Sequence, residues 1–335
     1  MNTVTRASIA TIIPLFNGQT NIALTVASVL AQTLQPDELI LVDDGSTDQT
    51  LEIALLAAEG AAFTVRSITQ KNARQSAARN AGAASTSCDF IAFLDQDDIW
   101  HPEHLERLVE AACEEADVGW TYSDFNEIDC HGRMVMRDCH RFLSANQSRR
   151  SLHEILCQDV FALPSASLIR RTAFNACGGF DPRLCGYEDD DLFVRMFSAG
   201  WNSAYVATAL VDYRRHDSSS SNGRSFWQSR ATFYTKMYEL YANGNQDVIE
   251  KLLRVRLLNN TKRDYAAALS AHAFDDARDI ANTMRGLFPQ QHIGILRRLA
   301  LALLQHPRVA LAVLSVWGRT PIARRWLSPE LRLQR

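Results

Sequence analysis

The sequence has no Cys-x-x-Cys pair, although it contains seven cysteines, which are scattered between positions 88 and 185. Zinc sites commonly use paired Cys-x-x-Cys motifs, and disulfide frameworks of small secreted domains use an even number of cysteines. The cysteine pattern therefore argues against a zinc finger or a disulfide scaffold. It indicates a reducing compartment.

Long apolar segments are missing as well. Residues 1–6 lack the basic start and apolar stretch of a signal peptide. No window reaches the ~20 uncharged apolar residues that a membrane-spanning helix needs. The composition, 47% hydrophobic and 22% charged, is that of a globular protein with a core. We expect a cytoplasmic protein that contacts a membrane, if at all, peripherally on its inner face.

Charge is unevenly distributed along the chain. Residues 225–335 contain 17 Lys and Arg against 8 Asp and Glu, whereas residues 1–224 contain 18 against 30. This asymmetry predicts two parts with different surroundings, divided at residue 224. The acidic first part argues against a nucleic-acid partner.

Short apolar runs alternate with helical patterns in the first part. We expect strands at 9–13, 39–42, 63–68, 90–94, 118–123, 166–169 and 203–206. We expect helices at 20–31, 47–58, 74–84, from Pro102 onward and at 189–199. Strand–helix–strand alternation predicts an α/β fold with a parallel, doubly wound sheet and right-handed crossovers. From about residue 225 onward the pattern is helical.

Polar residues follow several of the expected strands, at 14–17, 43–48 and 95–98, and a further acidic run at 188–191 opens a later helix. Ligands of open α/β sheets bind at the carboxyl ends of the strands. Carboxylates gathered at one edge repel each other unless a cation joins them. The pattern therefore predicts a cation-assisted ligand site at that edge.

These motifs, in this order, resemble those of family 2 glycosyltransferases with the GT-A fold. The residues that carry the resemblance are Thr11-Ile12-Ile13-Pro14-Leu15-Phe16-Asn17, Leu41-Val42-Asp43-Asp44-Gly45-Ser46-Thr47-Asp48, Asn72, Ala78-Arg79-Asn80-Ala81-Gly82, Phe93-Leu94-Asp95-Gln96-Asp97-Asp98, Gly178-Gly179-Phe180-Asp181 and Glu188-Asp189-Asp190-Asp191-Leu192-Phe193-Val194-Arg195. The resemblance covers roughly residues 8–216. It implies a Rossmann-like, mostly parallel sheet flanked by helices, as a catalytic domain at 1–224, followed by a helical C-terminal region at 225–335.

The resemblance also implies an activity. A nonprocessive, inverting enzyme would move one sugar from a nucleotide-diphosphate sugar to a glycan or lipid-linked acceptor, in the synthesis of cell-surface polysaccharide or glycolipid. The Gln-x-x-Arg-Trp motif of processive relatives is absent after Asp189. Two other functions stay open: a catalytically silent protein of the same fold that binds nucleotide or glycan, and a nucleotidyltransferase. The latter is disfavoured because residues 14–18 contain no Lys or Arg for a phosphate loop.

Asp95-Gln96-Asp97 resembles the DxD motif of the family. The resemblance makes Asp97 a direct ligand of Mg²⁺ or Mn²⁺, hard cations that prefer carboxylate and phosphate oxygens. His216, after a late strand, is a second candidate ligand, and an ordinary surface or core position is the alternative. Asp98 fits a structural role, as part of an acidic turn before the next helix.

The donor site follows from the same resemblance. Asp44 resembles the carboxylate that accepts a hydrogen bond from the imino group of uracil or guanine. The other expected donor contacts are Pro14, Leu15, Asn17, Asn72, Arg79, Asp95 and Gln96. For Arg79 an ion pair with a strand-end aspartate is an equally good interpretation. Trp100 is a candidate for stacking on a sugar face.

Asp189 resembles the catalytic base, which takes the proton of the acceptor hydroxyl. Glu188 is expected to orient the acceptor. Asp190 and Asp191 fit acids of a first helical turn, where the helix dipole favours negative charge. The metal would stabilise the departing diphosphate.

The C-terminal segment 291–335 carries eight arginines against Glu330, between short apolar runs. Arginine and tryptophan beside apolar helices suit an anionic membrane surface and a lipid-linked acceptor. A helical bundle that packs on the catalytic domain or forms a homo-oligomer fits the same segment equally well.

Overall fold

The computed structural model describes residues 6–142, 152, 156, 162–215, 224–241, 260–261, 263–287 and 306. His216 and the segment 291–335, apart from His306, lie outside the described residues, so their expected roles stay predictions. The chain divides into two compact units, Met1–Asn222 and Gly223–Arg335. Within the described part of the chain, no helix combines the length and the apolar character required to cross a membrane.

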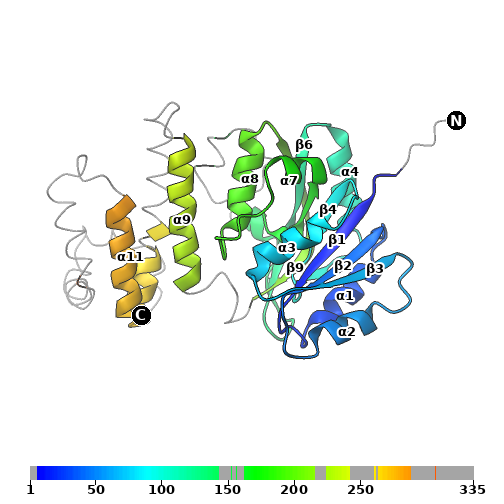
Figure 1. Cartoon of the computed structure of the whole chain (residues 1–335), viewed down its shortest axis with the longest axis horizontal. Coiled ribbons are helices and arrows are strands. Elements are labelled where there is room, and N and C mark those ends of the chain that lie inside the picture. Colours follow the sequence, from blue (N-terminus) through cyan, green and yellow to red (C-terminus); the bar gives the residue numbers. More distant parts are fainter. Residues whose placement is uncertain are drawn as a thin grey trace. The chain divides into compact units, whose positions relative to one another are not determined.

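The first unit alternates strands and helices along the chain (Figure 1). Its strands are β1 (Ile9–Leu15), β2 (Glu38–Asp43), β3 (Thr64–Thr69), β4 (Phe90–Phe93), β5 (Ile99–Trp100), β6 (Val118–Ile128), β7 (Met134–Met136), β8 (Ser167–Arg170) and β9 (Asn202–Arg214). Its helices are α1 (Ile22–Leu30), α2 (Thr50–Ala57), α3 (Arg74–Ala84), α4 (His104–Glu114), α5 (Cys139–Phe142), the 3₁₀ turn η1 (Pro164–Ala166), α7 (Arg171–Ala176) and α8 (Glu188–Ser198).

The strands form one sheet in the order β3-β2-β1-β4-β8-β6-β9-β5, and β7 pairs with β6. The strands β3, β2, β1 and β4 are parallel to one another, as the alternation predicts. β8 then runs antiparallel to both β4 and β6, and β5 runs antiparallel to β9. The α/β class is confirmed, but the sheet is mixed and not wholly parallel.

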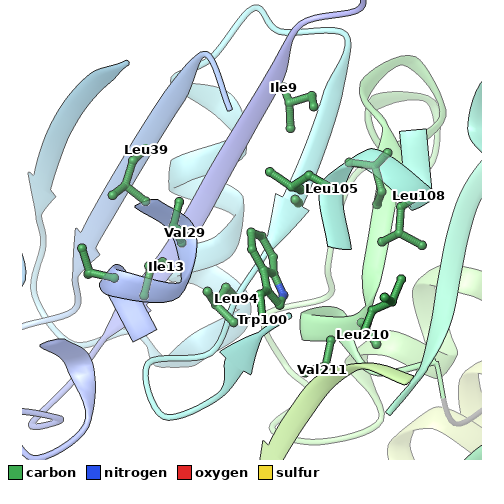
Figure 2. Close-up of a cluster of buried hydrophobic side chains, with 14 of the residues drawn as sticks. Ile9, Ile13, Val29, Leu39, Leu94, Trp100, Leu105, Leu108, Leu210 and Val211 are labelled. Atoms are coloured by element: carbon green, nitrogen blue, oxygen red, sulfur yellow. The ribbon is translucent and has the colours of Figure 1, made fainter. Parts of the chain in front are cut away.

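Side-chain alternation along the strands assigns the helices to two faces. Ile9 and Ile13 of β1 belong to one buried cluster with residues of α1 and α4 (Figure 2). Ala54 of α2 belongs to the same cluster. Ile12 points to the other face, because successive strand residues alternate, and there it meets α3 at Gly82. On that second face α7 and α8 bring aromatic rings against the sheet. The ring centroids of Phe93 and Phe174 lie 5.8 Å apart.

Trp100 belongs to the core on the first face, as Figure 2 shows. It is 3% exposed, its indole N–H donates to the Ser165 carbonyl at 2.6 Å, and its ring stacks on His104 at 4.4 Å. Burial lowers the pKa of His104 to about 3, so this ring pair is uncharged at neutral pH. The prediction that Trp100 stacks on a sugar is therefore wrong.

The second unit contains α9 (Arg224–Tyr241) and α11 (Phe274–Leu287), with further helical residues at 263–270. Its described core contains Tyr265, Leu269, Ala277, Ile280 and Ala281. An ion pair between the buried Arg230 of α9 and the partly exposed Asp264 lies within this unit. The helical pattern that the sequence predicts after residue 225 agrees with these elements.

Gly82 lets α3 approach the sheet closely. A Cβ atom at this position would lie 2.5 Å from Ile12 Cγ2 and 3.1 Å from Val42 Cγ2. For Gly82→Ala, overpacking should outweigh the gain in helix propensity, so we expect the free energy of unfolding to fall by roughly 1–2 kcal/mol. Urea denaturation measures this difference, and an increase in stability would contradict the close approach.

Candidate functional site

The carboxyl ends of β1 and β2 lie side by side. Leu15 pairs in register with Asp43, and the Asp44 N–H donates to the Leu15 carbonyl at 2.8 Å. The two loops beyond these strands are joined through Asn17, whose Oδ1 accepts the Thr47 N–H at 2.8 Å. The Asn17 N–H in turn donates to Ser46 Oγ at 3.2 Å. Asn17 therefore holds the two loops together, while the side chain of Leu15 is buried in the core.

Gln96 reaches the same edge from the loop after β4. Its amide binds the backbone of Phe16 at two points: Oε1 accepts the Phe16 N–H at 2.8 Å, and Nε2 donates to the Phe16 carbonyl at 2.9 Å. Gly18 makes room for this clamp, since a Cβ there would lie 2.3 Å from the Gln96 amide carbon. Gln96 thus positions the loop after β1.

Asp44 is buried, and one of its oxygens is occupied. Oδ1 accepts hydrogen bonds from Gln70 Nε2 at 2.7 Å and from the Ala73 N–H at 2.8 Å. Gln70 lies just beyond β3 and carries no sequence signal that separates it from other loop glutamines. Asn72 lies beside this site, with its backbone nitrogen close to Gly45, which has a φ of +81°.

The loop 95–98 contains three carboxylates with different surroundings. Asp95 and Asp97 are partly exposed, and Asp98 is 1% exposed. Asp98 Oδ1 accepts the Arg214 N–H of β9 at 2.9 Å, which gives Asp98 a structural role. Burial, together with the charges of Asp97 and Asp95, raises the pKa of Asp98 well above its usual range.

This crowding of negative charge bears on the predicted metal. Within the described residues no group of three or more His, Cys, Asp or Glu side chains is placed to hold a metal ion by itself. The residue types nevertheless suit a hard cation, because Asp95 and Asp97 place two partly exposed carboxylates in one loop. The diphosphate of a ligand would supply further oxygen atoms.

The acidic run at the start of α8 separates into different environments. Glu188, Asp190 and Asp191 are buried, and Asp189 is partly exposed. Asp191 pairs with Arg195 one turn later at 2.6 Å, and Arg195 Nη2 donates to the Gly179 carbonyl at 2.7 Å. Partial burial and the charges of Glu188 and Asp190 raise the pKa of Asp189 well above its usual range.

Arg79 forms ion pairs, the second of the two interpretations that its sequence context allows. Its side chain is 1% exposed, and it contacts Asp95 at 2.5 Å and Glu188 at 2.8 Å. Burial acts to lower the pKa of Arg79, but the charges of Asp95 and Glu188 outweigh it and raise the pKa. The guanidinium therefore joins the loop after β4 to the start of α8.

Asn80, next to Arg79, makes a second two-point clamp. Its Nδ2 donates to the Phe180 carbonyl at 2.8 Å, and its Oδ1 accepts the Phe180 N–H at 2.9 Å. A Cβ at Gly179 would lie 2.7 Å from that Oδ1, and Gly179 has a φ of +71°. The Asn80 clamp and the Arg195 contacts fix the turn that precedes α8.

The clamps of Asn80 and Gln96 differ mainly in burial, which allows a matched test. Phe180 is buried, so Asn80→Ala leaves a buried N–H and carbonyl without partners. We expect it to cost about 2–4 kcal/mol of unfolding free energy. Phe16 is 46% exposed, so water can replace the Gln96 amide, and Gln96→Ala should cost at most about 1 kcal/mol. Equal losses in urea denaturation would contradict this difference.

Comparison with known proteins places this arrangement in a family. The family model described as glycosyl transferase family 2 matches residues 10–178. An uncharacterized glycosyltransferase of Nostoc sp., alr2836, is 40% identical over 102 residues, which cover 30% of this chain and 32% of that protein. The O-antigen chain rhamnosyltransferase RfbN of Salmonella typhimurium is 27% identical over 213 residues, 61% of this chain and 65% of RfbN.

Solved structures agree in fold. A crystal structure of S. aureus TarS in complex with UDP-GlcNAc has a TM-score of 0.67 at 15% identity, and covers 91% of this chain and 89% of that one. The chain spans about a third of the length of the first curated relatives it matches. The family match extends over half of the chain, from the end that holds β1 to the turn before α8. The chain belongs to glycosyl transferase family 2.

Proposed function

We propose that this protein is an inverting, nonprocessive glycosyltransferase that moves one sugar from a nucleotide-diphosphate sugar to a glycan or lipid-linked acceptor. The product would serve cell-surface polysaccharide or glycolipid synthesis. The relatives support this class of acceptor, since RfbN is named as an O-antigen chain rhamnosyltransferase. The TarS complex with UDP-GlcNAc supports a nucleotide sugar as the donor.

One observation carries the proposal. Asp189 is the partly exposed member of an otherwise buried acidic run, and that run is ion-paired through Arg79 to the loop at 95–98. A partly exposed carboxylate with a raised pKa, next to a charged site, is suited to general-base catalysis. We assign the base to Asp189, and we assign Glu188 to holding its surroundings in place.

The donor would lie along the edge formed by the loops after β1, β2 and β4. Asp44 has one carboxylate oxygen engaged by Gln70 and Ala73, and we assign its other oxygen to the imino N–H of a pyrimidine or guanine base. Asn17 and Gln96 hold the loops in position around that base. Asp97 would hold Mg²⁺ or Mn²⁺ together with the donor diphosphate, with His216 as a second candidate ligand.

In the transfer step the acceptor hydroxyl oxygen attacks the anomeric carbon from the face opposite the diphosphate. The hydroxyl proton passes to Asp189, the new carbon–oxygen bond forms, and the bond to the diphosphate oxygen breaks with its electron pair. A bound divalent cation supplies charge stabilisation for the departing diphosphate. Attack from the opposite face accounts for inversion at the anomeric carbon.

The first test replaces the base. Asp189→Asn keeps the shape of the side chain but cannot accept a proton, so we expect turnover to fall by about 10²–10⁴-fold. Release of nucleoside diphosphate from UDP-, GDP- and dTDP-sugars, with Mn²⁺ and a glycan acceptor, measures it. Glu114→Gln, at an exposed position of α4, is the control and should retain wild-type turnover.

The same pair of variants gives a pH dependence. The base must be ionised, and the pKa of Asp189 is raised. Activity should therefore fall on the acid side at a higher pH than an ordinary aspartate would give. The residual activity of Asp189→Asn should lack this acid limb. Normal turnover in Asp189→Asn would assign the base elsewhere.

The second test concerns the metal. Asp97→Ala removes a ligand oxygen, so turnover and the stabilisation of the protein by UDP with Mn²⁺ should both be lost. EDTA should silence the wild type, and excess Mn²⁺ should restore it. Glu114→Ala serves as the matched control, because it removes an exposed carboxylate at the last residue of α4. Full turnover of the wild type in EDTA would contradict a metal-dependent mechanism.

A further inference from the structure

The ion pairs of Arg79 join two elements that the proposed reaction uses for different tasks. Nη2 donates to Asp95 Oδ1 at 2.5 Å, in the loop that follows β4. Nη1 donates to Glu188 Oε1 at 2.8 Å, at the first residue of α8. Arg79 itself lies on α3, inside the core and 1% exposed. A single rigid guanidinium therefore fixes the separation of the donor-side loop and the helix that carries Asp189.

The glutamate on this bridge is fully engaged. Oε1 of Glu188 also accepts Gln75 Nε2 at 2.5 Å, from the same helix as Arg79, and Oε2 accepts the Gly186 N–H at 2.7 Å. Both oxygens are thus bound by the protein. This leaves Glu188 poorly placed to contact an acceptor directly, and it makes Glu188 an anchor for the turn before α8.

That turn has an unusual backbone. Gly186 and Tyr187 both adopt positive φ, 96° and 64°, and Tyr187 is the residue that precedes α8. A left-handed tyrosine is uncommon and persists only where the surroundings hold it. The bonds from Glu188 to Gly186 and to Arg79 supply such a restraint, and Asp189 is the next residue along the helix.

The charges around Asp189 come from two elements. Glu188 and Asp190 of α8 oppose its ionisation, whereas the guanidinium of Arg79, from α3, favours it. The charge of Arg79 thus acts on Asp189 as well as on the two carboxylates that Arg79 contacts. Its position therefore affects both where Asp189 lies and how readily it becomes a base.

We propose that Arg79 is a positioning residue of the transfer reaction: it holds the base on α8 in register with the donor loop and does not contact the donor. The inference rests on the proposed transferase function. An arginine is required because its planar fork can bond two carboxylates at once, which the single ammonium of lysine cannot do in the same geometry.

The test uses Arg79→Lys, Arg79→Met, and Arg79→Met combined with Glu188→Gln. Arg66→Met is the matched control, because Arg66 forms an ion pair with Glu38 at 2.6 Å on the far strand of the sheet. Turnover of each variant should be measured with the donor on which the wild type is most active. We expect kcat to fall roughly 10²-fold in all Arg79 variants, since a small displacement of a catalytic group costs about that much.

The Michaelis constant for the donor should stay within about threefold of the wild-type value, which is a change of less than 1 kcal/mol. A large increase in that constant, with kcat retained, would show that Arg79 binds the donor and would overturn the proposal. Arg66→Met should match the wild type in both parameters. An Arg79 variant that keeps the wild-type kcat would also overturn the proposed positioning role of Arg79.

The pH dependence of activity separates two effects of Arg79: its charge, which acts on the pKa of Asp189, and its hydrogen bonds, which position α8. Arg79→Met removes a cation that favours the ionised form of Asp189, so the fall of activity on the acid side should move to higher pH. In the double variant the Glu188 charge is also gone, and the limb should return toward the wild-type position, although kcat stays low. Arg79→Lys keeps the charge and should keep the limb. A limb that is unchanged in Arg79→Met would contradict the proposal.

The double variant also guards against misfolding, because it removes a buried carboxylate that Arg79→Met alone would leave unpaired. The two proposals fail in different ways. An inactive wild type, with every nucleotide sugar and metal tried, overturns the transferase function. An active wild type whose Arg79 variants keep normal kcat overturns the positioning role alone.

Discussion

Several carboxylates gather at the carboxyl edge of this sheet, and the buried guanidinium of Arg79 pairs with two of them. Placing a charge at 1% exposure is costly unless opposite charges and hydrogen bonds compensate. Asp95 and Glu188 provide both. The loop after β4 and the start of α8 are therefore joined by one side chain from a third element, α3.

Two side-chain amides also hold these loops, through uncharged hydrogen bonds to the backbone. Gln96 and Asn80 each bind both backbone groups of one residue, as a neighbouring strand would, and each lies against a glycine that leaves room for it. Gln96 lies between the two aspartates of the DxD-like motif. Although Gln96 carries no charge, its two hydrogen bonds to the Phe16 backbone hold this loop against the loop after β1.

Much of the fold could be predicted from the sequence because strand ends carry strong local signals. The apolar runs locate β1, β2 and β4, and the polar residues that follow each of them mark the edge where the site lies. The orientation of β8 could not be predicted, because a short apolar run has the same pattern in either direction and only its pairing with β4 and β6 sets its sense. The two-residue β5 is too short to show a period.

The site residues divide in the same way. Asp44, Asp95, Asp97 and Asp189 stand in recognisable motifs, whereas Gln70 and Gln75 act through contacts between segments that are distant in sequence. Trp100 illustrates the opposite error. Its place after the acidic loop predicts a ligand contact. In the structure its ring lies in the core, where it stacks on His104 and donates a hydrogen bond to the Ser165 carbonyl.

The two hydrogen bonds from Gln96 to the Phe16 backbone have a consequence for substitutions at position 16. Because Gln96 binds the backbone atoms of Phe16, these two hydrogen bonds do not require a particular side chain at position 16. The Phe16 side chain, 46% exposed, lies at the edge where the loops after β1, β2 and β4 meet. A substitution at position 16 therefore changes the chemistry presented at this edge while both of these hydrogen bonds can still form.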